Sequence, residues 1–82
     1  MEVKQSLGIA IRNRRRSLAL SQEQLGTRAG LHRTYVGSIE RGERNITLFN
    51  MFRLARALEI SPVSLMEEIS VLEIFQPQRV ND

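Results

Sequence analysis

The basic residues are the residues of this chain whose type and spacing are suited to recognising a chemical group. The 82-residue sequence has twelve Lys and Arg residues, of which eleven are arginine. A guanidinium group is a planar fork of donors that matches phosphate oxygens and the edge of guanine, which a lysine ammonium does not. Residues 1–60 hold eleven basic and five acidic residues, a net charge of +6, whereas residues 61–82 hold one basic and four acidic residues, a net charge of −3. The basic part therefore fits a polyanionic partner.

Residues suited to catalysis or metal binding are scarce. The chain has no cysteine and one histidine, His32, so a disulfide framework and a cysteine-based metal site are excluded. We find no metal-ligand cluster, no nucleophile beside a base and no glycine-rich phosphate loop. The sequence therefore predicts a binding protein rather than an enzyme, with no cofactor, no metal and no small-molecule effector. No apolar run approaches the length of a membrane span, and the N-terminus lacks a signal-peptide core, so we expect a cytoplasmic protein without a membrane partner.

The spacing of apolar residues predicts an all-α fold of five short helices, which must position these side chains. We expect helices over residues 3–17, 22–29, 33–41 and 48–58, and a fifth that starts at Ser61-Pro62 and continues to Phe75. The first helix has one apolar stripe made of Val3, Leu7, Ala10, Ile11 and either Arg14 or Arg15. The fourth has a wide stripe made of Leu48, Met51, Phe52, Leu54, Ala55 and Leu58. We expect one domain over residues 1–76 and a disordered tail over residues 77–82.

The second and third helices are joined by a tight turn. Ser21 and Gln24 have the spacing of a capping box at the start of the second helix, and Gly30 stands where a left-handed residue ends it. Two short helices joined in this way form a helix-turn-helix, whose second helix enters the major groove of DNA. The sequence therefore predicts a compact DNA-binding domain.

The same segment resembles the Xre family of lambda-repressor-like helix-turn-helix proteins. The residues that carry the resemblance are Leu20-Ser-Gln-Glu-Gln-Leu25, Ala29-Gly-Leu31 and Tyr35-Val-Gly-Ser-Ile-Glu-Arg-Gly42, within residues 5–69. The stretch from Arg33 to Ile46 is similar to the dimeric controller proteins of bacterial restriction-modification systems. The sequence departs from the commonest family pattern at His32, which we expect to be a weaker cap for the recognition helix than the usual Asp or Ser.

The resemblance and the positions on the recognition helix imply a set of DNA contacts. Gln22 and Asn45 are expected to meet phosphates, and Arg33 and Arg44 to read bases. Tyr35 either contacts DNA or wedges into the rim of the core. The complete set of expected DNA-binding residues is Gln22, Arg33, Thr34, Tyr35, Ser38, Arg41, Arg44 and Asn45.

Two further roles follow from the resemblance and from the apolar pattern. Arg15 and Glu40 are expected to form a partly buried ion pair, and Glu40 is also a candidate contact for RNA polymerase. The fifth helix is more apolar than a small monomer requires. We expect Leu65 to lie in the core, and a homodimer interface made of Met66, Ile69, Leu72 and Phe75.

These features predict a homodimer that regulates transcription by binding a two-fold symmetric operator on double-stranded DNA. The narrower resemblance points to the controller of a restriction-modification system in a bacterium. An antitoxin-type or phage-type repressor of the same family is the alternative. An antitoxin is the less favoured of these, because few residues follow Ile69 to wrap a toxin.

Overall fold

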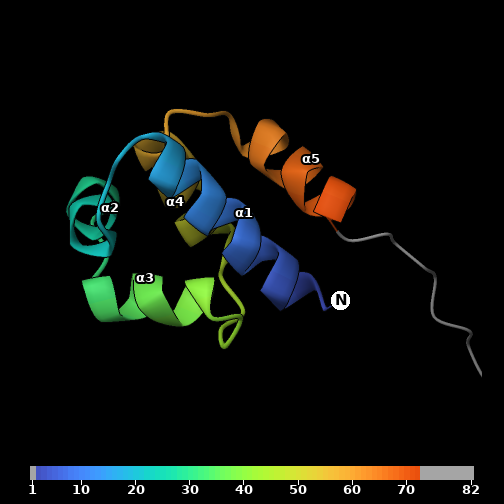
Figure 1. Cartoon of the computed structure of the whole chain (residues 1–82), viewed down its shortest axis with the longest axis horizontal. Coiled ribbons are helices and arrows are strands. Elements are labelled where there is room, and N and C mark those ends of the chain that lie inside the picture. The colour runs from blue at the N-terminus through green and yellow to red at the C-terminus, as the bar shows by residue number, and fades with distance from the viewer. Residues whose placement is uncertain (1, 73–82) are drawn as a thin grey trace, which may run out of the picture.

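The computed structural model describes residues 2–72, with side chains described through residue 69. This part of the chain forms five helices: α1 (Val3–Ser17), α2 (Gln22–Ala29), α3 (Arg33–Glu40), α4 (Leu48–Ala57) and α5 (Pro62–Leu72) (Figure 1). It contains no strand, so the all-α prediction is confirmed. The first two helices have the predicted bounds. The next two are one residue shorter than predicted, because Arg41 and Leu58 are their C-terminal caps.

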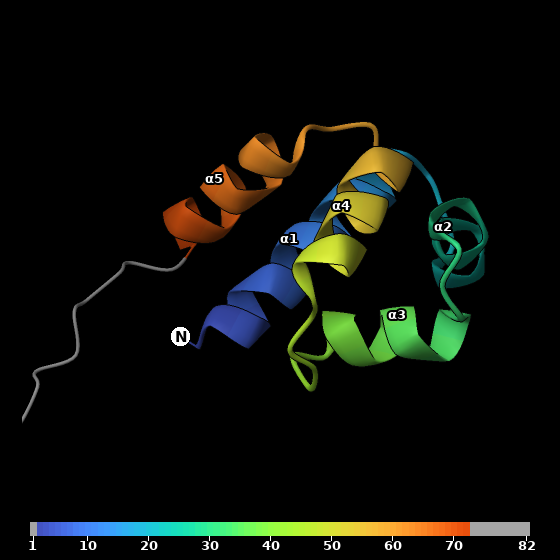
Figure 2. The ribbon, with the colours of Figure 1, turned by 180° about the vertical axis from the view of Figure 1, so that it is seen from behind.

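The helices are arranged around α1. Helices α3 and α5 both pack against α1, while α2 packs against α3 and α4, and α4 packs against α5. Figure 1 shows α2 and α3 together at one end of the molecule and α5 at the other. In the reverse view of Figure 2, α4 lies in front of α1, and α5 lies beside α1. The arrangement therefore leaves the α2–α3 pair and the outer sides of α4 and α5 open to partners.

The core is formed by the predicted apolar stripes, with exceptions at helix ends. Leu65 is fully buried, as predicted, and Leu7, Ala10 and Ile11 of α1 are also buried in the core. Val3 is 60% exposed, so its predicted place in the stripe was wrong. It is the first residue of α1, and burial begins one turn later at Ser6.

Helix α4 is less buried than its stripe predicted. Leu54, Ala55 and Leu58 are fully buried. Leu48 and Phe52, which the stripe included, are 68% and 53% exposed. The N-terminal half of α4 therefore presents apolar side chains to solvent instead of to the core.

A close crossing of α1 and α3 depends on Gly8. A methyl group added at Gly8 would lie 2.5 Å from the carbonyl oxygen of Ile39 and 2.6 Å from that of Glu40. Glycine inside a helix is less stable than alanine by about 1 kcal/mol, so a packing reason is expected for it. Here the absent side chain lets the two backbones approach.

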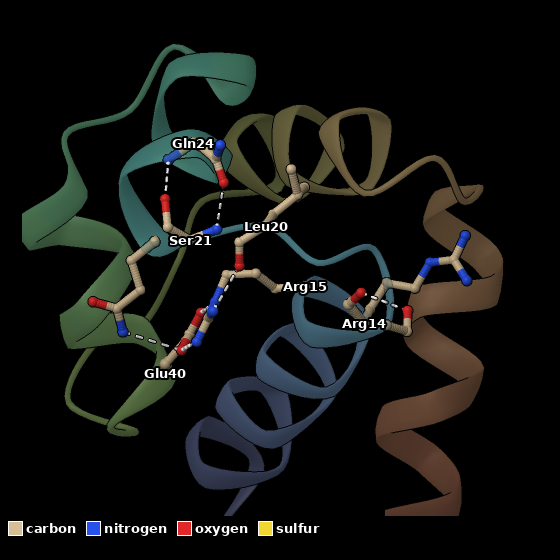
Figure 3. A network of polar contacts seen from close by, with 8 residues as sticks. Arg14, Arg15, Leu20, Ser21, Gln24 and Glu40 are labelled. Atoms are coloured by element: carbon tan, nitrogen blue, oxygen red, sulfur yellow. Dashed lines mark hydrogen bonds and ion pairs between the residues drawn. The ribbon is translucent and has the colours of Figure 1, made fainter.

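The start and end of α2 are set by local hydrogen bonds. The Ser21 hydroxyl accepts from the backbone N–H of Gln24 (3.0 Å), and the side-chain oxygen of Gln24 accepts from the backbone N–H of Ser21 (2.8 Å). These two bonds confirm the capping box (Figure 3). Gly30 ends α2 with φ 70°, and the N–H of Leu31 donates to the carbonyl of Gly26 (2.8 Å). A left-handed residue at this place lets the chain turn directly into α3.

The predicted ion pair between Arg15 and Glu40 is confirmed. Arg15 Nε and Nη2 donate to the two carboxylate oxygens of Glu40 at 2.6 and 2.8 Å, and Arg15 Nη1 donates to the carbonyl of Leu20 at 2.8 Å (Figure 3). The side chains are 11% and 3% exposed. The hydrogen bond to Glu40 raises the pKa of Arg15 above its ordinary value. The ion pair joins α1 to α3.

Loss of Arg15 should destabilise the fold far more than loss of an exposed arginine. Arg15→Ala leaves the buried Glu40 carboxylate unpaired, so we expect the free energy of unfolding to fall by about 3–5 kcal/mol in urea titrations followed by circular dichroism. Arg28→Ala is the matched control, because its pair with Glu59 (3.0 Å) lies in solvent and should contribute no more than about 1 kcal/mol. Equal losses in the two variants would contradict a structural role for the Arg15–Glu40 pair.

Candidate nucleic-acid interface

The turn between α2 and α3 is as compact as a helix-turn-helix requires. Only Gly30, Leu31 and His32 separate the two helices. A methyl group added at Gly26 would lie 2.5 Å from the carbonyl oxygen of Leu31, so this glycine lets the turn fold back onto α2. The result is a short α3 held against α2, with one side free.

Helix α3 has a buried side and a polar side. Val36 and Ile39 are fully buried in the core. Arg33 and Thr34, in its first turn, are exposed. Two of the predicted DNA-binding side chains, at the start of the recognition helix, are therefore available to a ligand.

His32 caps α3 through its side chain. Its Nδ1 accepts from the N–H of Thr34 at 3.0 Å. An imidazole nitrogen that accepts a hydrogen bond carries no proton, so a neutral His32 carries its proton on Nε2. The imidazole thus replaces the carboxylate or hydroxyl oxygen that is usual at this position.

Acidic side chains pair with two of the predicted DNA-contacting arginines. Arg33 Nη1 lies 2.6 Å from Glu23 Oε2 of α2, and both side chains are about two-thirds exposed. Arg41 donates to both carboxylate oxygens of Glu43, at 2.9 and 3.2 Å. This hydrogen bonding lowers the pKa of Glu43 and raises that of Arg41. Neither glutamate had a role predicted from the sequence; the pair between Arg33 and Glu23 joins α3 to α2 and so depends on the fold.

Tyr35 lies at the edge of the core. The ring is partly buried and packs against the core cluster. Its hydroxyl accepts from Asn50 Nδ2 at 3.1 Å, and the Arg44 guanidinium lies 5.6 Å from the ring centre. The geometry shows the predicted wedge at the core rim, and contact of the partly exposed ring with DNA stays a prediction. The ring also adjoins Arg44 in the loop that carries Arg44 and Asn45. Both of these loop residues are exposed.

Ser38 is not placed as predicted. It is 5% exposed, and its hydroxyl donates to the carbonyl of Tyr35 at 2.7 Å. A side chain this buried is not available for the predicted DNA contact, so the structure contradicts this role for Ser38. The small size of serine suits its packing inside the domain.

Gln22 is the first residue of α2 and is partly exposed. Its side-chain Nε2 donates to Glu40 Oε1 at 3.1 Å, an interaction that the sequence did not predict. Because the Glu40 carboxylate is enclosed by Gln22 and Arg15, the structure does not present it for the predicted contact with RNA polymerase.

The predicted dimer residues have different environments. Met66 is 52% exposed, whereas Ile69 is partly buried and packs against the core. The Leu72 side chain and Phe75 lie outside the described residues. The apolar side chains that the structure shows to be exposed on α4 and α5 are Leu48, Phe49, Phe52, Val63 and Met66.

Within residues 2–72, no group of three or more His, Asp or Glu side chains is placed to hold a metal ion. No helix of this part of the chain is both long and apolar enough to span a membrane.

Comparison with known proteins identifies the fold. Residues 11–65, more than half of the chain, match the family described as Helix-turn-helix. The chain belongs to this family. The match contains α2, the turn at Gly30 and α3, so the predicted helix-turn-helix is confirmed. As a member, the chain is a DNA-binding regulator of transcription and not an enzyme.

Proteins similar to this family member include several restriction-modification controllers, as the sequence predicted. The control protein C.SmaI of Serratia marcescens is 48% identical over 66 residues, which cover 80% of this chain and 79% of the relative. The crystal structure of the controller protein C.AhdI from Aeromonas hydrophila has a TM-score of 0.74 at 45% identity, covering 76% and 94% of the two chains. The wild-type controller C.Esp1396I has a TM-score of 0.80 at 29% identity, covering 93% and 96%.

Removal of the Glu23 charge should strengthen DNA binding. Glu23→Gln releases Arg33 from its ion pair and removes a negative charge from the surface that carries Arg33, so we expect affinity to rise several-fold at low salt. Glu67→Gln is the control, because Glu67 lies on α5 at the other end of the molecule. Affinity can be compared by fluorescence anisotropy at two salt concentrations. If Glu23→Gln lowered the affinity, the pair would be supporting the bound state instead of competing with it.

Proposed function

We propose that the chain binds a two-fold symmetric operator as a homodimer and controls transcription in a restriction-modification system. The observation that carries the proposal is the exposed first turn of α3, where Arg33 and Thr34 project from a capped and packed recognition helix. The similarity to C.SmaI and C.AhdI supports the role as a controller. The proposal needs no small-molecule effector.

Each remaining predicted contact has a part in this proposal. Arg33 reads a guanine through N7 and O6, and Thr34 meets the neighbouring base. Arg44, stacked near Tyr35, reaches the DNA from the loop after α3. Gln22, Arg41 and Asn45 hold phosphates and so fix the register of the domain. Ser38 and the RNA polymerase contact through Glu40 are left out, because both side chains are buried.

The homodimer interface is proposed on α4 and α5. Five large apolar side chains on these two adjoining helices, namely Leu48, Phe49, Phe52, Val63 and Met66, are each more than half exposed. Apolar exposure concentrated on neighbouring elements of a small domain marks an association surface. Met66 belonged to the predicted interface, and the α4 residues extend it. Two copies joined there would set their recognition helices about 34 Å apart, one helical turn of DNA.

The experiment that tests the proposal is a gel-shift of the protein with the DNA upstream of its own gene, with random competitor DNA at two salt concentrations. We expect a discrete complex that resists competitor, protects a two-fold symmetric site and weakens steeply with salt. A smear that random DNA removes completely would contradict sequence-specific operator binding.

Arg33→Ala should lower operator affinity by about 1–3 kcal/mol and relax the sequence preference at one position of each half-site. The reason is the loss of the two donors that recognise guanine. Binding to a panel of single-base operator variants measures both effects. Arg12→Ala, an exposed arginine of α1, is the control and should leave the preference unchanged. An equal loss on every sequence would show that Arg33 contacts phosphate.

Met66→Asp should convert the dimer to a monomer in analytical ultracentrifugation and weaken operator binding, because the two half-sites are then no longer bound together. Phe52→Asp should do the same from α4. Val3→Asp is the matched control, since Val3 is 60% exposed but lies on α1. If both variants remained dimeric, the interface would have to lie elsewhere.

A further inference from the structure

The contact between Gln22 and Glu40 joins the start of α2 to the end of α3. Gln22 Nε2 donates to Glu40 Oε1 at 3.1 Å, while Arg15 Nε donates to Glu40 Oε2 at 2.6 Å. The Glu40 side chain is 3% exposed. A carboxylate held in this way cannot rotate, so it is a fixed acceptor for the Gln22 amide.

Gly37 provides the space in which the Gln22 side chain lies. A methyl group added at Gly37 would lie 3.3 Å from Gln22 Oε1 and 3.2 Å from Arg41 Nη1. Both distances are shorter than most carbon contacts of this kind, so the neighbouring side chains would have to move. Gly37 is buried in the middle of α3, where alanine would favour the helix more. The contact with Gln22 gives a reason for glycine at this position.

We infer that Gly37 and Glu40 together form a seat that positions the Gln22 amide to hold a DNA phosphate. This inference rests on the proposed DNA binding and names Gly37 and Glu40 as positioning residues for it. The Gln22 amide has two N–H donors, and Glu40 accepts one of them. The structure gives the other N–H no partner among the described residues. That donor stands at the N-terminus of α2, where the helix dipole favours an anion.

The seat affects binding through the entropy of the Gln22 side chain. A glutamine that is free in solution loses rotamer freedom when it binds a phosphate, and a glutamine already held by Glu40 loses less. Glu40 itself carries a negative charge and is buried, so it acts on DNA only through Gln22. The functional effect of Gly37 and Glu40 should therefore disappear when Gln22 is removed.

A double-mutant cycle between Gly37→Ala and Gln22→Ala tests this dependence. In the otherwise unchanged protein, Gly37→Ala should weaken operator binding about three- to tenfold, the range expected for one side chain that must be ordered again. The melting temperature should not fall, because alanine favours the helix. In the Gln22→Ala background, Gly37→Ala should cause no further loss of affinity. A repeat of the cycle in the Arg41→Ala background should leave the Gly37 effect in place, which assigns the effect to Gln22.

The salt dependence of binding gives a second readout. Gln22→Ala removes a neutral donor, so the slope of log affinity against log salt should not change, whereas Arg41→Ala should reduce it by about one. Glu40→Gln offers an independent variant, because the amide replaces one carboxylate oxygen by an NH2 donor that opposes the Arg15 N–H groups, so the acceptor for Gln22 loses its fixed position. It should lower stability in both backgrounds but lower DNA affinity only while Gln22 is present.

The outcomes separate this inference from the proposed function. If the unchanged protein forms no operator complex, the proposed function fails. If that complex forms but Gly37→Ala has no effect, or weakens binding equally with and without Gln22, then Gly37 and Glu40 do not position Gln22. The proposed function is unaffected by that result. An equal loss in the two backgrounds would show that the methyl group meets the DNA directly.

Discussion

The buried ion pair between Arg15 and Glu40 is the constraint on which the arrangement of this domain depends. A charge removed from water is tolerated only if every oxygen and N–H finds a partner, and here Leu20 and Gln22 complete the set. The partners come from α1, α3, the preceding loop and the start of α2. One electrostatic requirement therefore fixes the position of both helices of the helix-turn-helix relative to α1. The close crossing at Gly8 is what brings the two charged residues within reach of each other.

The exposed polar side chains and the exposed large apolar side chains lie largely on different helices of the domain. Exposed arginines and polar side chains lie on α3 and the loop that follows it, whereas five of the six large apolar side chains that are exposed among the described residues lie on α4 and α5. A small domain buries a limited share of its surface, so additional apolar area can be stabilised by a second copy of the chain. Association and DNA recognition can then be changed separately by mutation. The acidic C-terminal part of the sequence agrees with this division.

The sequence predicted the parts of the structure that depend on neighbours along the chain. Ser21 with Gln24, and Gly30, give local signals that define α2, and the family pattern indicated Arg15 with Glu40. The wrong or missing predictions concern residues whose surroundings come from distant segments. Ser38 was expected to face DNA because its position on α3 is polar, yet the fold covers it. Phe52 was expected in the core because it shares a stripe with Leu54 and Leu58, yet its side chain is 53% exposed.

The pairing of Arg33 with Glu23 has a consequence for how the protein finds its site. A free guanidinium is attracted to any phosphate, and such attraction retains a protein on random DNA. The neighbouring carboxylate occupies the guanidinium until a better partner replaces it, and a guanine edge of the right geometry is such a partner. Binding is therefore weakened wherever the guanidinium must leave the carboxylate, on the operator as well as on random sequences. The acid beside the recognition helix thus limits how strongly this one arginine can hold the protein on DNA, which favours exchange between sites.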